Sequence, residues 1–198
     1  MQFKALVVVA SLVAASVAQT FSMFEDNLKM KVVPAMNNLN ATIHEFPMMG
    51  GRTVKKAMAI HYSVMDLVDA ANSITDIMNV GSYISVCISQ CSNRLFKKKM
   101  TSKFSDEEGM KILSDFQGMK PTFMDAMQGM VARMPALNAL PRGGVTSLVE
   151  KDLEDLKSCA EAFITAFNDH VSPEMVKEAE PLEDMGISTI SQVMQIHK

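Results

Sequence analysis

Apolar residues recur every three or four positions along most of the chain, which is the spacing of one face of an α-helix. The first such stripe extends from Leu28 to Phe46, and Pro34 within it is expected to kink or restart the helix. A second helix is predicted from about Thr53 to Met78. Strands would need apolar and polar residues in alternation, and no stretch of the sequence has that pattern.

The second half of the chain has sharper boundaries. Ser105 and Glu108 have the spacing of a capping box, which begins a helix. Pro121 is expected either to kink that helix or to begin a new one, and a hinge from Met134 to Gly144 is expected to end it. The most regular apolar stripe of the sequence follows the hinge: Val149, Leu153, Leu156, Ala160, Phe163 and Phe167.

The last helix is predicted to begin at Ser172 and Pro173, which suit the N-cap and the first helical position. Pro181 and Gly186 are expected to interrupt it. Together these patterns predict an all-α fold, an antiparallel bundle of about five long amphipathic helices.

Residues 1–18 have the features of a signal peptide, with Lys4 before an apolar run and small residues before a cleavage point after Ala18. That run is too short to cross a bilayer as a helix. We therefore expect a secreted protein, extracellular or associated with the cell wall, whose residues 19–198 form a single helical-bundle domain. Asn40 opens an Asn-Ala-Thr sequon and is a glycosylation candidate.

Residues 81–102 form an atypical insertion in this pattern. The stretch holds Cys87 and Cys91 and a basic cluster of Arg94 and three lysines, without a regular helical stripe. A basic patch for nucleic acid or membrane is one interpretation, and a solvated loop is the one we favour. The net charge of −3 also argues against a nucleic-acid partner.

Methionine is unusually frequent, with 19 residues against no tryptophan. Its flexible, polarizable side chain fills irregular apolar space and adapts to varied neighbours. Methionine and phenylalanine stripes are ordinary core in most helical proteins. The residues that could instead contact a lipid or an apolar surface are Phe116, Phe123, Met127, Met130, Phe163 and Phe167.

The sequence contains no recognised catalytic motif, and no cofactor is expected. Its four histidines have no metal-binding spacing, and His61 is interpreted as a hydrogen-bonded structural residue. The acidic clusters at 106–108 and 150–155 are expected in first turns of helices, where they complement the helix dipole. Cys159 is expected to be a small buried hydrophobe rather than part of a disulfide framework or a zinc site.

Several segments resemble, in the same order, the fungal hydrophobic surface-binding protein A family, which is related to cell-wall galactomannoproteins. They are FPMMGG at 46–51, AMAIH at 57–61, FSDEEG at 104–109, PTFMDA at 121–126, PALNALPRGG at 135–144 and LVEKDLEDL at 148–156. The resemblance implies a secreted, non-enzymatic helical protein that binds hydrophobic surfaces and recruits secreted hydrolases to them. The related mannoprotein domains imply an alternative, a carrier of fatty acids or other lipids in an internal apolar channel.

The family pattern passes from the second helix to the FSD cap with only a few residues between them. We hypothesise that residues 81–102 are a translated intron, with a genuine insertion as the alternative. Sequencing the mature transcript across this junction tests the hypothesis. We expect spliced copies that lack the segment, and its retention in every spliced copy would contradict the hypothesis.

Overall fold

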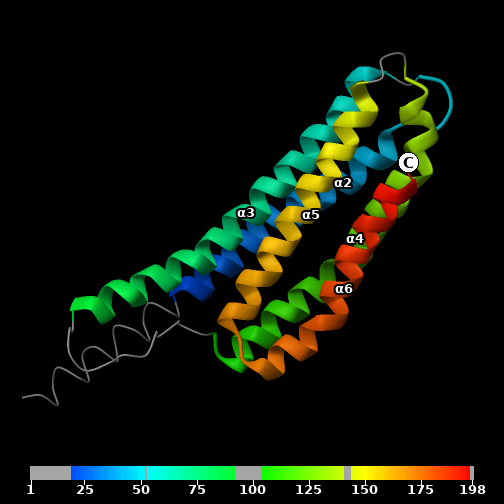
Figure 1. The fold of residues 1–198 in the computed structure, drawn as a ribbon. Coiled ribbons are helices and arrows are strands. Elements are labelled where there is room, and N and C mark those ends of the chain that lie inside the picture. Colours follow the sequence, from blue (N-terminus) through cyan, green and yellow to red (C-terminus); the bar gives the residue numbers. More distant parts are fainter. Residues whose placement is uncertain (1–18, 52, 92–103, 141–143, 197–198) are drawn as a thin grey trace, which may run out of the picture.

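The computed structural model of this protein describes residues 19–51, 53–91, 104–140 and 144–196 (Figure 1). Every regular element within these ranges is a helix. The elements after the N-terminal helical residues 19–27 are η1 (Leu28–Val32), α2 (Val33–Glu45), α3 (Val54–Cys91), α4 (Asp106–Asn138), α5 (Gly144–His170) and α6 (Pro173–Ile196). The all-α prediction of about five long helices is confirmed.

The five α-helices pack side by side as a ring. Helix α3 packs against α2 and α5, α6 packs against α5 and α4, and α4 packs against α2. Successive helices run in opposite directions (Figure 1). Because α4 and α5 touch only slightly across the ring, the centre must be filled by side chains from all sides or remain partly empty.

The first predicted stripe forms one buried face. Its six members are at most 9% exposed: Leu28, Val32, Met36, Leu39, Ile43 and Phe46. Pro34 is accommodated without a break, because the turn before it is the π-helical segment η1 and Pro34 lies at the start of α2. A π-helical turn departs from the regular i to i−4 hydrogen bonding of an α-helix, which is where a helix accommodates an irregularity.

The predicted interruptions at Pro135 and Pro181 are wrong, and of the two alternatives for Pro121 the start of a new helix is wrong. Pro121 and Pro135 lie inside α4, which extends to Asn138, and Pro181 lies inside α6, which also continues through Gly186. An internal proline removes one backbone hydrogen bond. Here buried residues on both sides of the hinge proline, such as Met134 and Leu137, keep the two halves packed on the ring.

Helix α3 is longer than predicted. It continues beyond Met78 to Cys91, so the solvated loop favoured for residues 81–102 is wrong for residues 81–91. An established helix elongates at low cost per residue, and this stretch contains no proline. Residues 92–103, including the basic cluster, lie outside the described residues, and the intron hypothesis stays a prediction.

The predicted helix caps are present. The Ser105 hydroxyl accepts a bond from the Glu108 backbone N–H at 3.2 Å, and the Glu108 carboxylate accepts one from the Ser105 N–H at 2.8 Å. Ser172 accepts a 3.4 Å bond from the Met175 N–H at the start of α6. These bonds satisfy backbone donors that have no partner inside the helix.

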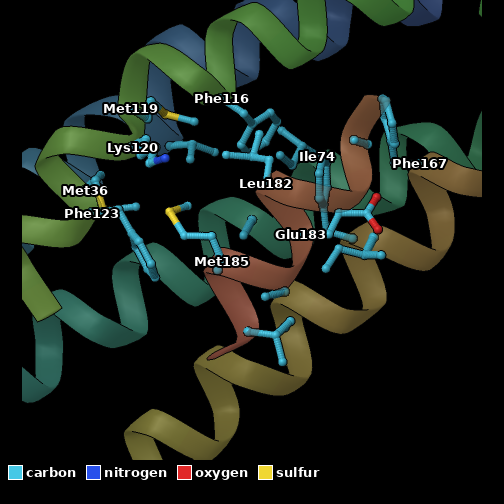
Figure 2. A pocket seen from close by; sticks show the side chains of 18 of the residues that line it. Met36, Ile74, Phe116, Met119, Lys120, Phe123, Phe167, Leu182, Glu183 and Met185 are labelled. Atoms are coloured by element: carbon cyan, nitrogen blue, oxygen red, sulfur yellow. The ribbon is translucent and has the colours of Figure 1, made fainter. Parts of the chain in front are cut away.

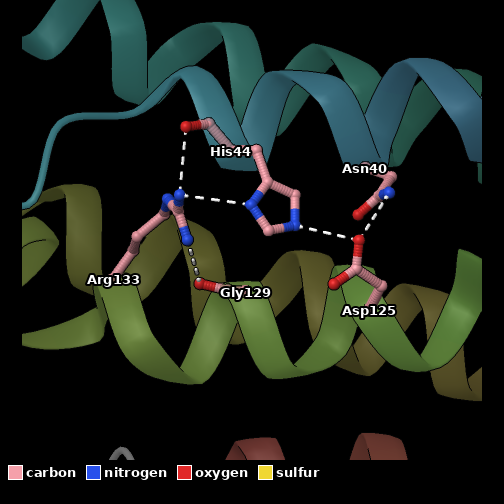
Figure 3. A network of polar contacts seen from close by, with 5 residues as sticks. All are labelled: Asn40, His44, Asp125, Gly129 and Arg133. Carbon is pink, nitrogen blue, oxygen red and sulfur yellow. Dashed lines mark hydrogen bonds and ion pairs between the residues drawn. The ribbon is translucent and has the colours of Figure 1, made fainter.

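A polar network fixes the end of α2 to α4 (Figure 3). Arg133 donates to the carbonyl oxygens of His44 at 3.0 Å and Phe46 at 3.1 Å, which lie at the C-terminus of α2. It also approaches His44 Nδ1 at 3.3 Å, while His44 Nε2 lies 3.1 Å from Asp125 Oδ2. A guanidinium group can only donate hydrogen bonds, so Nδ1 of His44 accepts the bond from Arg133. Nε2 of His44 then carries the ring proton and donates it to Asp125 Oδ2.

The two helices approach closely at this network. A Cβ placed on Gly129 would lie 3.0 Å from Ile43 Cγ2 and 3.3 Å from His44 Nε2. Both nitrogens of the His44 ring are already used, and their partners, Arg133 and Asp125, both lie on α4. We therefore interpret the network as a structural clamp between α2 and α4.

Candidate functional site

An apolar cavity of about 180 Å³ lies inside the ring of helices (Figure 2). All five α-helices contribute to its wall, together with Val32 of η1. Among the lining residues are Met36, Leu67, Ala71, Ile74, Ile112, Phe116, Met119, Lys120, Phe123, Ala160, Phe163, Phe167, Ala179, Leu182, Glu183, Met185, Gly186 and Ile190. The cavity is consistent with the ring, in which α4 and α5 make little direct contact across the centre.

Phenylalanine rings form one side of this cavity. The rings of Phe116 on α4 and Phe163 on α5 are tilted by 39°, with centroids 4.7 Å apart. Phe163 continues to Phe167 at 6.3 Å and to Phe24 at 6.4 Å. Aromatic contacts at these separations add to the stability gained from burial alone. The rings therefore make a fixed apolar wall across α4 and α5.

The remaining wall contains adaptable side chains. Met36, Met119 and Met185 come from three different helices (Figure 2). A cavity of roughly 150 Å³ lined by aliphatic residues is enough to admit benzene. A long acyl chain is larger than benzene, so its entry requires movement of the wall. Methionines suit that movement because their rotamers exchange easily.

Four of the six residues predicted to contact lipid line the cavity: Phe116, Phe123, Phe163 and Phe167. The other two, Met127 and Met130, are each 1% exposed and belong to the packed core instead. The stripe on α4 is continuous in sequence. Only its part around residues 112–123 reaches the cavity, whereas the later turns contact α2.

Sequence reasoning missed the two charged residues of the wall. Lys120 on α4 and Glu183 on α6 lie on opposite sides of the cavity (Figure 2). Lys120 follows Met119 directly and precedes Pro121, and its nearness to the apolar stripe was the available indication. Glu183 lies next to Leu182 in a stretch expected to be interrupted, which concealed its position.

The carboxyl group of Glu183 is in an unfavourable environment for charge. Burial raises its pKa above the ordinary value of 4.5, and a hydrogen bond with Asn168 offsets part of this effect. Its Oε1 atom is buried without a hydrogen-bond partner among the described residues. A desolvated carboxylate with an unused acceptor is destabilising for the folded protein.

A second buried carboxyl group lies between α3 and α5. Asp152 is 2% exposed, and its Oδ1 atom lies 2.8 Å from His61 Nδ1. Burial raises the pKa of Asp152 and the bond to His61 lowers it, with burial the larger effect. Neither residue lines the cavity. The structural interpretation of His61 therefore fits its geometry, since the histidine joins two helices.

The expected placement of the acidic cluster at 150–155 is wrong. Helix α5 begins at Gly144, so these residues lie well beyond its first turn, and Asp152 points to His61 rather than to a helix end. The cluster at 106–108 does occupy the first turn of α4. The error arose because the hinge was expected to extend to Gly144 and the next helix to begin later.

Cys159 is a buried, unreactive thiol in α5. It is 5% exposed, and its sulfur lies 3.7 Å from the carbonyl oxygen of Val68. Burial, followed by the negative charge of Asp69, raises its pKa to about 11. A thiol reacts as the thiolate, which this environment disfavours. The described residues also contain no group of histidine, cysteine and acidic side chains suited to a metal ion.

The candidate glycosylation residue, Asn40, lies in the middle of α2. It is half-buried, and its Nδ2 donates a 3.0 Å bond to Asp125 Oδ2 (Figure 3). This bond is the largest cause of the lowered pKa of Asp125. Nδ2 is also the atom that a glycan would modify, so glycosylation would have to be compatible with the clamp.

Comparison with solved structures identifies similar folds. Ligand-binding domain 1 of the Penicillium marneffei MP1 protein, complexed with arachidonic acids, has a TM-score of 0.69 at 13% identity, over 90% of this chain and 99% of that one. Domain 2 of the same protein, complexed with multiple arachidonic acids, has a TM-score of 0.67 at 15% identity, over 89% and 94%. AFMP4P in complex with palmitic acid has a TM-score of 0.66 at 18% identity, over 92% and 99%.

The TM-scores show a shared fold, and at these low identities they show the fold alone. No protein-family model matches the chain, and no curated protein matches it. The resemblance to the hydrophobic surface-binding protein A family therefore stays a prediction from the quoted segments. The structural neighbours are described as ligand-binding domains or fatty-acid complexes.

Replacing Glu183 by glutamine tests the environment of the cavity carboxyl group. Because folding raises the pKa of Glu183, ionisation of this carboxyl group destabilises the folded protein. The destabilisation is absent below pH 4.5, where the group is protonated in both states, and it is complete once the pH has risen through the pKa of the folded state. We expect Glu183→Gln to increase the free energy of unfolding at neutral pH and to have less effect below pH 4.5, measured by urea denaturation. The control is Glu178→Gln, an exposed position of α6. A loss of stability in Glu183→Gln at neutral pH would contradict the account.

Proposed function

We propose that this protein binds the hydrocarbon chain of a fatty acid inside the ring of helices. The observation that supports this most directly is the cavity, which is apolar, is lined by every α-helix and contains only two charged residues. Transfer of a hydrocarbon chain from water into such a site is favourable by about 0.8 kcal/mol for each CH₂ group buried. Three domains with the same fold, from two proteins, were solved with arachidonic or palmitic acid, which supports the same ligand class.

The proposal makes the protein a carrier and not an enzyme. The polar groups described above are used as helix clamps, and the thiol is buried with a raised pKa. Binding of a fatty acid needs none of them to react. The predicted signal peptide, residues 1–18, lies outside the described residues, and secretion to the medium or cell wall remains part of the proposal. No helix in the described ranges is both long and apolar enough to cross a membrane.

Adsorption to hydrophobic surfaces is a second candidate function, and one feature favours it. The turn between α2 and α3 presents Met48, 55% exposed, and Met49, 88% exposed. Gly50 and Gly51 follow with φ values of 64° and 61°, a conformation that favours glycine. This tip could touch an apolar solid without opening the bundle. Recruitment of secreted hydrolases, implied by the family resemblance, would depend on this second function.

Titration of delipidated protein with a fluorescent fatty acid distinguishes the two functions. A carrier gives saturable binding that unlabelled palmitate competes away. Strong depletion of the protein onto hydrophobic beads, without saturable binding, would favour adsorption and contradict the carrier.

A substitution at Gly186 tests whether the cavity is the binding site. This residue lines the cavity, and a Cβ built on it meets no atom within 4 Å. We expect Gly186→Phe to fold, since phenylalanine is the better helix former, and to weaken binding by roughly tenfold or more by occupying the cavity. Binding is measured by the same fluorescence titration.

Gly118→Phe is the matched control. Gly118 lies in α4, is exposed and also has open space at its Cβ, but it does not line the cavity. We expect this variant to bind the fatty acid as the unmodified protein does. Equal binding by both variants would place the ligand elsewhere.

A further inference from the structure

The cavity wall contains one cationic side chain, and its position is unusual. Lys120 is exposed overall, yet it lies among the lining residues between Met119 and Phe123 on α4. A lysine in this situation can lay its methylene stem along apolar surface while its ammonium group stays in water. Across the described residues, no carboxylate lies within ion-pair distance of Lys120. Its charge is therefore available to a ligand.

The charges of the wall favour one orientation of an anionic ligand. Lys120 on α4 and Glu183 on α6 lie on opposite sides of the cavity (Figure 2). A fatty acid carries a negative charge at neutral pH, and moving that charge into an apolar cavity is strongly unfavourable unless it is paired. The carboxylate is attracted to Lys120 and repelled by ionised Glu183. The hydrocarbon tail, in contrast, fits against Phe116 and Phe163.

We infer that Lys120 binds the carboxylate of the ligand, so that the site selects anionic single-chain lipids over uncharged ones. This inference rests on the proposed function, because it requires an acyl chain in the cavity. The inference adds a binding site for the carboxylate head group and an orientation for the acyl chain within the cavity. We expect the head-group contact to contribute about tenfold to palmitate affinity, which corresponds to about 1.4 kcal/mol.

The test compares two ligands with the same chain, palmitate and hexadecanol, by equilibrium dialysis of the radiolabelled lipids. Lys120→Met keeps most of the side-chain volume and removes the charge. We expect it to weaken palmitate binding on the order of tenfold and to leave hexadecanol binding unchanged. Lys120→Arg should retain palmitate binding. Lys177→Met, at an exposed position of α6 that does not line the cavity, is the matched control and should bind both ligands normally.

The experiment distinguishes failure of the head-group site from failure of the proposed fatty-acid binding. If the unmodified protein binds both ligands and Lys120→Met binds palmitate equally well, the head-group site is wrong and the carrier function stands. An equal loss of palmitate and hexadecanol in Lys120→Met would also overturn the inference, because it would show an effect on the wall and not on the charge. If the unmodified protein binds neither ligand, the proposed function fails and the inference fails with it.

Discussion

The closed ring of five helices is the constraint on which the rest of this structure depends. Each helix is held by two neighbours, and α4 and α5 face each other across the centre with little direct contact. Protein interiors are normally packed to the density of organic crystals. A ring of this size can reach that density only if large side chains extend to its axis. In this chain Phe116 and Phe163 do so, but the adjacent positions include Ala71, Ala160 and Gly186, and a cavity remains.

Polar contacts hold parts of the ring in register and leave the cavity apolar. Arg133 and Asp125 join α4 to α2, and the pair of His61 and Asp152 joins α3 to α5. Helix α6 meets the ring mainly through apolar side chains, together with the bond between Glu183 and Asn168 of α5 and a weak bond from Thr189 to the sulfur of Met124 at 3.6 Å. Since apolar contacts are not directional, we propose that α6 and the methionines of the wall would adjust if a chain longer than the cavity entered.

The sequence was sufficient for the helical class and for most buried positions, because the 3.6-residue period depends only on which residues avoid water. It was insufficient at Pro135, where packing on both sides outweighed the local preference for a break. It also placed Asp152 in a first turn, since the true start of α5 was hidden in the hinge.

The candidate site was harder to predict for a related reason. Periodicity shows which residues face inward, but it does not show that Phe123 lines the cavity whereas Met127, one turn later on α4, is packed in the core. That depends on the ring, which no local pattern specifies. Lys120 and Glu183 were missed because charged residues are usually assigned to the solvent face, although their stems can form part of an apolar wall.

The most direct test of the account is to locate a bound fatty acid by isotope-filtered nuclear magnetic resonance, with ¹³C-labelled palmitate in unlabelled, delipidated protein. We predict intermolecular nuclear Overhauser effects between the ligand methylenes and the ring protons of Phe116 and Phe163, which form the wall across α4 and α5. Effects confined to exposed residues such as Met48 and Met49, with none to these rings, would contradict it.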